Sequence, residues 1–311
     1  MSILVAADFT PGEWAVWLPA LSSALPQENL LRERGAVAAE EVDVAIVANP
    51  PPGALAGLPR LRLVQSLWAG VEKLLADPTV PAHVPLARMV DPAMNEAMAE
   101  TALWAVLSLQ RDFFDYALQQ RASRWQPHSQ RTAAETTVTV LGLGQMGRTV
   151  ALRLARAGYR VTGWSARPAA IPGVRTLAGD AALVSAVEDA QVLVNLLPLT
   201  PATRGLIGAR LLAALPRGAS VVNLARGAHL VEADLLDALA SGQLRHAVLD
   251  VFATEPLAPS HPFWSHPQVT VLPHVAAQTD ARTASALAAA NIIALREGRP
   301  LQHVVDRARA Y

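Results

Sequence analysis

The sequence of 311 residues contains no cysteine, which excludes disulfide bonds, catalytic thiolates and zinc sites built on cysteine. It also has no net charge, because 26 Lys and Arg residues balance 26 Asp and Glu residues. Although a local basic patch is compatible with this balance, no overall positive field attracts nucleic acid or an anionic membrane. We therefore expect neither nucleic acid nor a membrane as a partner.

Long apolar runs are missing too, since no stretch approaches the roughly 18 residues that a membrane-spanning helix needs. The first residues carry no basic segment and Asp8 interrupts their apolar run, so we expect no secretory signal. Together with the lack of cysteine, this favours a cytoplasmic protein. The chain is 52% hydrophobic and long enough for two domains with a large core.

Short apolar runs bounded by Pro, Gly or charged residues predict strands in two blocks, with helical patterns between most of them. Such alternation is typical of parallel sheets covered on both faces. The predicted strands are residues 2–7, 42–48, 61–67, 137–141, 160–164, 192–196, 220–224, 247–251 and 269–272.

Two helical patterns suggest how these blocks are organised. A long pattern over residues 94–120 suits a helix that links two domains, and a helix over 281–297 lies beyond the last strand. If the last helix returns to the first domain, that domain is split. We predict a domain of residues 1–98 and 277–311, with residues 99–276 inserted in it.

A glycine-rich segment lies between a predicted strand and a helical pattern, as a dinucleotide-binding turn requires. Gly142 makes the tight turn, Gly144 lets the backbone approach a pyrophosphate, and Gly147 allows close packing of helix on strand. The helix that begins around Gln145 and Met146 then directs free N–H groups at the phosphates. The alternative is a glycine-rich turn in another kind of α/β protein. We predict a nicotinamide dinucleotide at these five residues.

The choice of dinucleotide depends on the end of the next strand. An NAD site usually carries Asp or Glu about 20 residues after the glycines, bonded to the ribose 2′-hydroxyl. Ser165 stands at that place, and no acidic residue occurs between Glu135 and Asp180. Ser165 can hydrogen-bond a 2′-phosphate and Arg167 can pair with it, unless Arg167 is only a solvated loop residue. We expect NADPH as the preferred cofactor, with NADH possible.

Three further motifs follow at the ends of predicted strands, where open parallel sheets bind ligands. They contain Arg226, Glu255 and His274. Reduction of a keto acid needs a hydride from the cofactor, a proton and a clamp for the carboxylate. His274 is suited to give the proton near neutral pH, and a neighbouring Glu255 would favour its protonated form. Arg226 can bind the carboxylate through two hydrogen bonds and polarise the keto oxygen.

Each of these residues also has an ordinary structural explanation. The histidine could be structural, the glutamate a turn residue before Pro256, and the arginine a surface charge. Their occurrence together, in this order after the glycine turn, favours an active site that reduces a small 2-keto acid without a metal ion.

At these residues the sequence resembles the D-isomer-specific 2-hydroxyacid dehydrogenases, which combine a G-x-G-x-x-G turn with an A-R-G arginine, a D-V-F-x-x-E-P glutamate and a P-H histidine. The resemblance implies an α/β fold of two doubly wound parallel-sheet domains, in which a Rossmann-type cofactor domain is inserted in a flavodoxin-like substrate domain. It also implies that further residues contact the cofactor, near the nicotinamide ribose or the nicotinamide itself: Leu197, Pro198, Thr203, Ala225 and Asp250.

Within this family the chain is similar to bacterial glyoxylate/hydroxypyruvate reductases over nearly its whole length. That subgroup implies NADPH-dependent reduction of glyoxylate to glycolate and of hydroxypyruvate to glycerate, in a cytoplasmic homodimer. The segments that carry this likeness are residues 164–165, 195–198, 224–230, 273–277 and 305–311.

The predicted substrate loop departs from the wider family, in which it is small and rich in glycine. Here it reads Ser66-Leu-Trp68-Ala69-Gly70. The backbone N–H groups of Ala69 and Gly70 remain able to bind a carboxylate. Trp68 is bulky, and it either lines the substrate pocket or packs in the domain interior.

Three other functions fit parts of the same pattern. An NAD-dependent relative such as phosphoglycerate or formate dehydrogenase would share the catalytic trio, although Ser165 and the lack of a sequence for an appended regulatory domain argue against it. A dinucleotide-sensing corepressor would bind cofactor with catalysis incidental. A structural α/β protein would have no use for the trio. Turnover of glyoxylate with NADPH distinguishes these readings.

Overall fold

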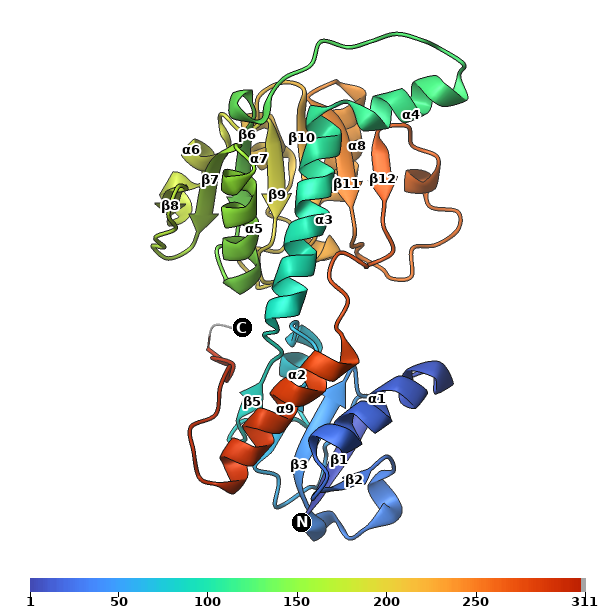
Figure 1. The fold of residues 1–311 in the computed structure, drawn as a ribbon, viewed down its shortest axis with the longest axis vertical. Coiled ribbons are helices and arrows are strands. Elements are labelled where there is room, and N and C mark those ends of the chain that lie inside the picture. Colours follow the sequence, from blue (N-terminus) through green and yellow to red (C-terminus); the bar gives the residue numbers. More distant parts are fainter. Residues whose placement is uncertain (309–311) are drawn as a thin grey trace. The chain divides into compact units, whose positions relative to one another are not determined.

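The computed structural model describes residues 1–308, which form two compact units (Figure 1). One unit comprises residues 1–94 and 279–308, and the other comprises residues 95–278. The sequence predicts the divisions at 98/99 and 276/277. Residues 309–311, which it assigned to the split domain, lie outside the described residues.

The split unit contains a five-stranded parallel sheet in the order β2-β1-β3-β4-β5. This order is that of flavodoxin-like sheets and confirms the predicted fold class. The central strand β3 is apolar except for Asp43, and every residue of it is buried. The strands are β1 (Ser2–Ala7), β2 (Asn29–Leu31), β3 (Val42–Ala48), β4 (Leu63–Ser66) and β5 (Leu86–Ala87).

The helices of this unit are α1 (Pro11–Ala24), α2 (Glu72–Ala76) and α9 (Ala281–Arg296). The last of them packs beside α1, so α9 returns to the unit in which the chain begins (Figure 1). Arg296 fixes this return, because its guanidinium bonds both Glu28 and the fully buried Asp43. Pairing with Arg296 lowers the pKa of Glu28 below its usual value. A buried carboxylate such as Asp43 requires a partner of this kind.

The second unit contains a seven-stranded parallel sheet in the order β12-β11-β10-β9-β6-β7-β8. Counted from β6, this is the predicted Rossmann order, and one further strand lies beyond the sixth. The strands are β6 (Thr137–Leu141), β7 (Arg160–Ser165), β8 (Arg175–Ala178), β9 (Val192–Asn195), β10 (Ala219–Asn223), β11 (Leu244–Leu249) and β12 (Val269–Val271).

Successive residues of a strand point to opposite sides of the sheet. Both faces of this sheet are apolar, and helices cover both. Val192 and Val194 pack with α3 (Pro92–Gln110) and α5 (Gln145–Arg156), whereas Leu193 packs with the helices of the other face. Those helices are α6 (Leu183–Val187), α7 (Ala209–Ala214) and α8 (Glu232–Ala240). In residues 1–308 no helix is both long and apolar enough to cross a membrane.

The prediction of a single helix over residues 94–120 is wrong, because α3 ends at Gln110 and a separate helix, α4 (Phe113–Arg121), follows. Asp112 lies between them with a left-handed φ of 57°. Its buried carboxylate accepts a hydrogen bond from the Arg245 guanidinium and lies 3.4 Å from His128 Nδ1. These contacts with the rest of the unit hold a backbone conformation that few residues besides glycine adopt.

His246 lies on β11, near the break between α3 and α4, and is buried. Its ring stacks on Phe114 with centroids 4.6 Å apart, and its Nε2 lies 2.9 Å from Thr270 Oγ1. Burial lowers the pKa of His246 from 6.5 to about 4, and the positive charges of Arg245 and His266 act in the same direction. The folded chain therefore keeps this imidazole neutral in a pH range where the unfolded chain protonates it.

We expect the free energy of unfolding to fall between about pH 6.5 and pH 4, because only the unfolded state takes up this proton there. The whole pKa difference corresponds to about 3 kcal/mol as an upper value. In His246→Leu this part of the pH dependence should disappear. Urea denaturation of both proteins at several pH values in this range measures it. Parallel curves for the two proteins would show that His246 does not carry the effect.

Candidate active site

The predicted site residues of the second unit lie in loops that leave one edge of its sheet. Backbone hydrogen bonds continue from strand to strand beyond the last paired residues, as between Leu196 N and Leu141 O (2.8 Å) and between Asp250 N and Asn223 O (3.0 Å). Because all strands of the sheet are parallel, their carboxyl ends meet at this edge. The glycine turn and the loops of the catalytic trio therefore share one side of the unit.

The glycine turn after β6 has a shape that only glycine permits at two positions. Gly142 has a φ of 92°, and a Cβ atom there would lie 2.6 Å from Leu196 O. A Cβ atom on Gly147 would lie 1.7 Å from Gly142 O, so α5 begins directly against the turn. At Gly144 a Cβ atom would meet nothing within 4 Å. This open space, beside the free N–H groups at the start of α5, fits a dinucleotide pyrophosphate. The first two residues of α5 are Gln145 and Met146.

The two residues predicted to bind a 2′-phosphate lie on one turn at the end of β7. Ser165 Oγ donates a hydrogen bond to Arg167 O at 2.7 Å, and Ser165 O accepts one from Gly179 N at 3.1 Å. Gly142 N donates to Trp164 O at 2.8 Å, so this turn adjoins the glycine turn. The Arg167 side chain is exposed. Both side chains thus stand at the same edge as the glycine turn.

His274 and Glu255 form a pair, with His274 Nδ1 2.7 Å from Glu255 Oε2. Phe252 N donates to the other carboxylate oxygen at 2.9 Å, which fixes the carboxylate. When Nδ1 donates its proton to Glu255, Nε2 is the ring atom that can exchange a proton with a ligand. The His274 side chain is 53% exposed, so a ligand can reach it.

The backbone of His274 has a left-handed φ of 56°, which is uncommon for histidine. Three hydrogen bonds to Asp250 hold it: His274 N donates to Asp250 O (2.9 Å), Val275 N to Oδ1 (2.7 Å) and Ala276 N to Oδ2 (3.0 Å). Burial raises the pKa of Asp250, and the two backbone donors to its carboxylate oppose this. Asp250 therefore supports the turn of His274, whereas its contact with a cofactor stays a prediction.

Arg226 follows β10 in a loop that packs against the loop of Glu255. A Cβ atom on Gly227 would lie 1.9 Å from the carbonyl carbon of Phe252, so only glycine allows the two backbones to approach this closely. Arg226 Nη1 donates to Ala225 O at 2.7 Å. The structure thus brings the loops of all three predicted catalytic residues together.

The loop after β9 carries Leu197, Pro198 and Thr203, and Thr203 Oγ1 donates to Pro198 O at 2.7 Å. Three polar residues lie next to this loop, and the sequence predicted no role for them: Asn195, Asn223 and His229. All three are fully buried, and they hydrogen-bond to one another. The only sequence signal for them is an amide at the end of each of two apolar strand runs.

The predicted substrate residues Trp68, Ala69 and Gly70 lie in the split unit, just after β4. The Trp68 ring packs edge-on against Trp17, with centroids 5.5 Å apart, and lies 6.3 Å from Phe9. Trp68 N donates to Ser66 Oγ at 3.0 Å, while its buried Nε1 has no hydrogen-bond partner among the described residues. Trp68 is therefore a packing residue of this unit, and its predicted contact with substrate stays a prediction.

Comparison with known proteins gives concordant results. Residues 103–276 match the family model of the D-isomer specific 2-hydroxyacid dehydrogenase NAD binding domain. The chain is 44% identical over 295 residues to glyoxylate/hydroxypyruvate reductase A of Serratia proteamaculans, covering 93% of this chain and 94% of that one.

Two solved structures show the same fold throughout. A D-isomer specific 2-hydroxyacid dehydrogenase of Xanthobacter autotrophicus Py2, in complex with NADPH and MES, has a TM-score of 0.94 at 41% identity, covering 100% of this chain and 99% of that one. An NADPH-dependent glyoxylate/hydroxypyruvate reductase of Sinorhizobium meliloti, in complex with NADP and sulfate, has a TM-score of 0.94 at 36% identity, with 100% of both chains covered. The chain belongs to the D-isomer-specific 2-hydroxyacid dehydrogenase family.

Proposed function

We propose that the protein reduces glyoxylate to glycolate and hydroxypyruvate to glycerate with NADPH. The observation that carries this proposal is the His274–Glu255 pair, 2.7 Å apart, on a loop next to that of Arg226 at the ligand-binding edge of the sheet. The relatives from Serratia and Sinorhizobium bear the name of this activity, and the related Xanthobacter structure contains NADPH.

In this proposal the unit of residues 95–278 binds the cofactor. The bound cofactor supplies the hydride. The pyrophosphate lies against Gly144 and the start of α5, and the 2′-phosphate lies at Ser165 and Arg167. The nicotinamide end lies near the loop of Leu197, Pro198 and Thr203 and near Ala225 and Asp250.

The catalytic side chains have separate tasks. Glu255 orients the imidazole of His274 through Nδ1, so that Nε2 gives its proton to the keto oxygen. Arg226 binds the substrate carboxylate and polarises the keto oxygen. The contact of the Ala69 and Gly70 N–H groups with the substrate carboxylate stays a prediction.

A panel of 2-keto acids, each assayed with NADPH and with NADH, tests the proposal. We expect glyoxylate and hydroxypyruvate to be reduced fastest, and NADPH to give the higher kcat/KM. Tight binding of NADPH without turnover of any keto acid would contradict the proposal and favour a dinucleotide sensor.

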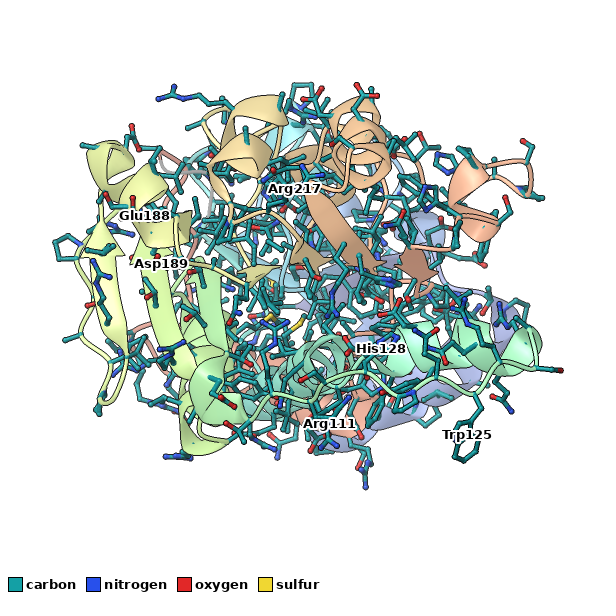
Figure 2. The ribbon with its side chains drawn as sticks, turned by 90° about the horizontal axis from the view of Figure 1, so that it is seen from above. Arg111, Trp125, His128, Glu188, Asp189 and Arg217 are labelled. Atoms are coloured by element: carbon teal, nitrogen blue, oxygen red, sulfur yellow. The ribbon has the colours of Figure 1, made fainter. Side chains whose placement is uncertain are left out.

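We also propose that the protein is a cytoplasmic homodimer. Several large apolar side chains of α3, α4 and the segment that follows are exposed, and exposed apolar surface favours association. Trp104 is 42% exposed, Phe113 48% and Trp125 97%, and Figure 2 shows Trp125 pointing away from the ribbon. The lack of cysteine fits a reducing compartment. Light scattering that returned the mass of a single chain would contradict the dimer.

A further inference from the structure

Three polar side chains form a buried cluster at the carboxyl edge of the second sheet. Asn195 ends β9 and Asn223 ends β10, and the two residues are register partners in these neighbouring strands. His229 lies in a short 3-10 turn, Gly227–His229, directly after Arg226. All three residues are 0% exposed. Buried polar groups of this kind destabilise a fold unless they are hydrogen-bonded, so their partners define their role.

Backbone groups fix the orientation of both amides. Leu197 N donates to Asn195 Oδ1 at 3.2 Å, so the other end of the Asn195 amide is the Nδ2 donor. Asn223 Nδ2 donates to Arg226 O at 3.0 Å, so the other end of the Asn223 amide is the acceptor. Asn195 Nδ2 accordingly donates to Asn223 Oδ1 at 2.9 Å.

The amides in turn fix the tautomer of His229. Asn195 Nδ2 also lies 3.0 Å from His229 Nδ1, and because the amide nitrogen is a donor, Nδ1 must be the acceptor. His229 Nε2 then carries the proton, and it faces Pro198 O at 3.2 Å. His229 is therefore a neutral bridge that accepts at one ring nitrogen and donates at the other.

We propose that His229 is a positioning residue that joins the nicotinamide side of the cofactor site to the loop of Arg226. The inference rests on the proposed function, which places the cofactor at residues 197–203 and the keto acid at Arg226. His229 belongs to the Arg226 loop and donates to Pro198 O, which also accepts the bond from Thr203. One imidazole thus fixes the positions of the two loops relative to each other.

Loss of this bridge leaves one N–H of the fully buried Asn195 amide without its acceptor and takes from Pro198 O one of its two donors, since Thr203 remains. Unsatisfied buried groups of this kind are relieved by movement of the backbone that carries them. In this case the moving segments are the two loops that bind cofactor and substrate. The expected consequence is weaker binding of NADPH together with poorer use of the keto acid, in addition to any loss of stability.

The variants His229→Leu and His229→Gln separate these effects. Leucine fills the space but can neither accept nor donate, whereas a glutamine amide can do both. His246→Leu is the matched control, because it removes another buried imidazole of the same unit, one that pairs with Thr270 on the neighbouring strand β12 and has no part in the proposed site. Thermal unfolding, the dissociation constant of NADPH from its fluorescence, and KM and kcat for glyoxylate are measured for each.

We expect His229→Leu to lower kcat/KM for glyoxylate about 10- to 30-fold and to weaken NADPH binding several-fold, consistent with the loss of buried hydrogen bonds. His229→Gln should recover most of both. His246→Leu should lower the unfolding temperature by a similar amount with kinetics like the wild type. In nitrogen NMR of histidine rings, the wild-type signal that is missing from the spectrum of His229→Gln should show an unprotonated Nδ1.

Three results would overturn the proposal: unchanged NADPH binding and kinetics in His229→Leu, no recovery in His229→Gln, or a proton on Nδ1. The binding and NMR measurements do not need turnover. If the wild type failed to reduce glyoxylate but His229→Leu still weakened NADPH binding, the proposed function would be contradicted. The positioning role of His229 would still be supported.

Discussion

The variant His274→Ala is expected to reduce glyoxylate about 10²–10⁴-fold more slowly than the wild type, which is the usual effect of removing a positioned general acid. The structure supports this size of effect because both the ring and the backbone of His274 are held in place. Glu255 holds its Nδ1 at 2.7 Å, and Asp250 holds its backbone in a left-handed conformation. Alanine leaves no group to protonate the keto oxygen, so the expected loss is in kcat.

Measurement of kcat with saturating NADPH and glyoxylate tests this expectation, and fluorescence should show NADPH binding little changed. His261→Ala is the matched control, because His261 Nε2 lies 3.3 Å from Glu232 Oε2 in another histidine–glutamate pair of the same unit. That variant should turn over glyoxylate like the wild type. Equal kcat in His274→Ala and the wild type would remove His274 from the mechanism.

The sequence pattern located best the strands whose residues are buried on both faces. β3 is apolar except for Asp43 and β9 is apolar except for its last residue, Asn195, and both occur where the pattern predicts them. β8 was not predicted, because it lies at the edge of its sheet and none of its residues is fully buried. Its residues, Arg175 to Ala178, have no apolar pattern to detect, since an edge strand needs less burial.

The break between α3 and α4 could not be predicted from the sequence for a different reason. The helical periodicity continues through Asp112, and Asp is compatible with a helix interior. The contact that fixes the break comes from Arg245, which is 133 residues away along the chain. A pattern within one segment contains no information about such a partner, so the helix was predicted too long.

Some residues of the candidate site could likewise be predicted from the sequence, and others could not. Arg226, Glu255 and His274 could be recognised because chemically distinctive residues stand at the ends of apolar runs, where parallel sheets bind ligands. The bridge through His229 could not, because it depends on the register that places Asn195 beside Asn223 and on the orientation of two amides. The roles of the trio in catalysis stay predictions, and His274→Ala tests the role of His274.

The second large effect that we expect concerns the choice of cofactor. The wild type should prefer NADPH over NADH, and the double variant Ser165→Asp with Arg167→Ala should lose most of that preference. The new carboxylate would accept hydrogen bonds from a ribose diol and repel a 2′-phosphate, while the lost guanidinium would no longer attract one. Changes of specificity commonly need both an attractive and a repulsive element.

The structure supports the joint action of these two positions. Ser165 Oγ bonds Arg167 O at 2.7 Å, so both side chains leave the same short turn, and Gly142 N bonds the carbonyl of the preceding Trp164. A single charge-assisted contact contributes about 1.5–3 kcal/mol, or roughly 10- to 150-fold in affinity. The preference of the wild type should fall within this range if Arg167 makes the main contact with the phosphate.

Values of kcat/KM for NADPH and NADH at saturating glyoxylate measure the preference in each protein. Arg160→Ala serves as the control, because Arg160 is an exposed arginine at the opposite end of the same strand, where it bonds Glu135 O at 3.2 Å. That variant should keep the preference of the wild type. A wild type that favours NADH would refute the argument from Ser165 and Arg167. If the wild type favours NADPH and the double variant keeps the full preference, the 2′-phosphate must be bound by residues other than this turn.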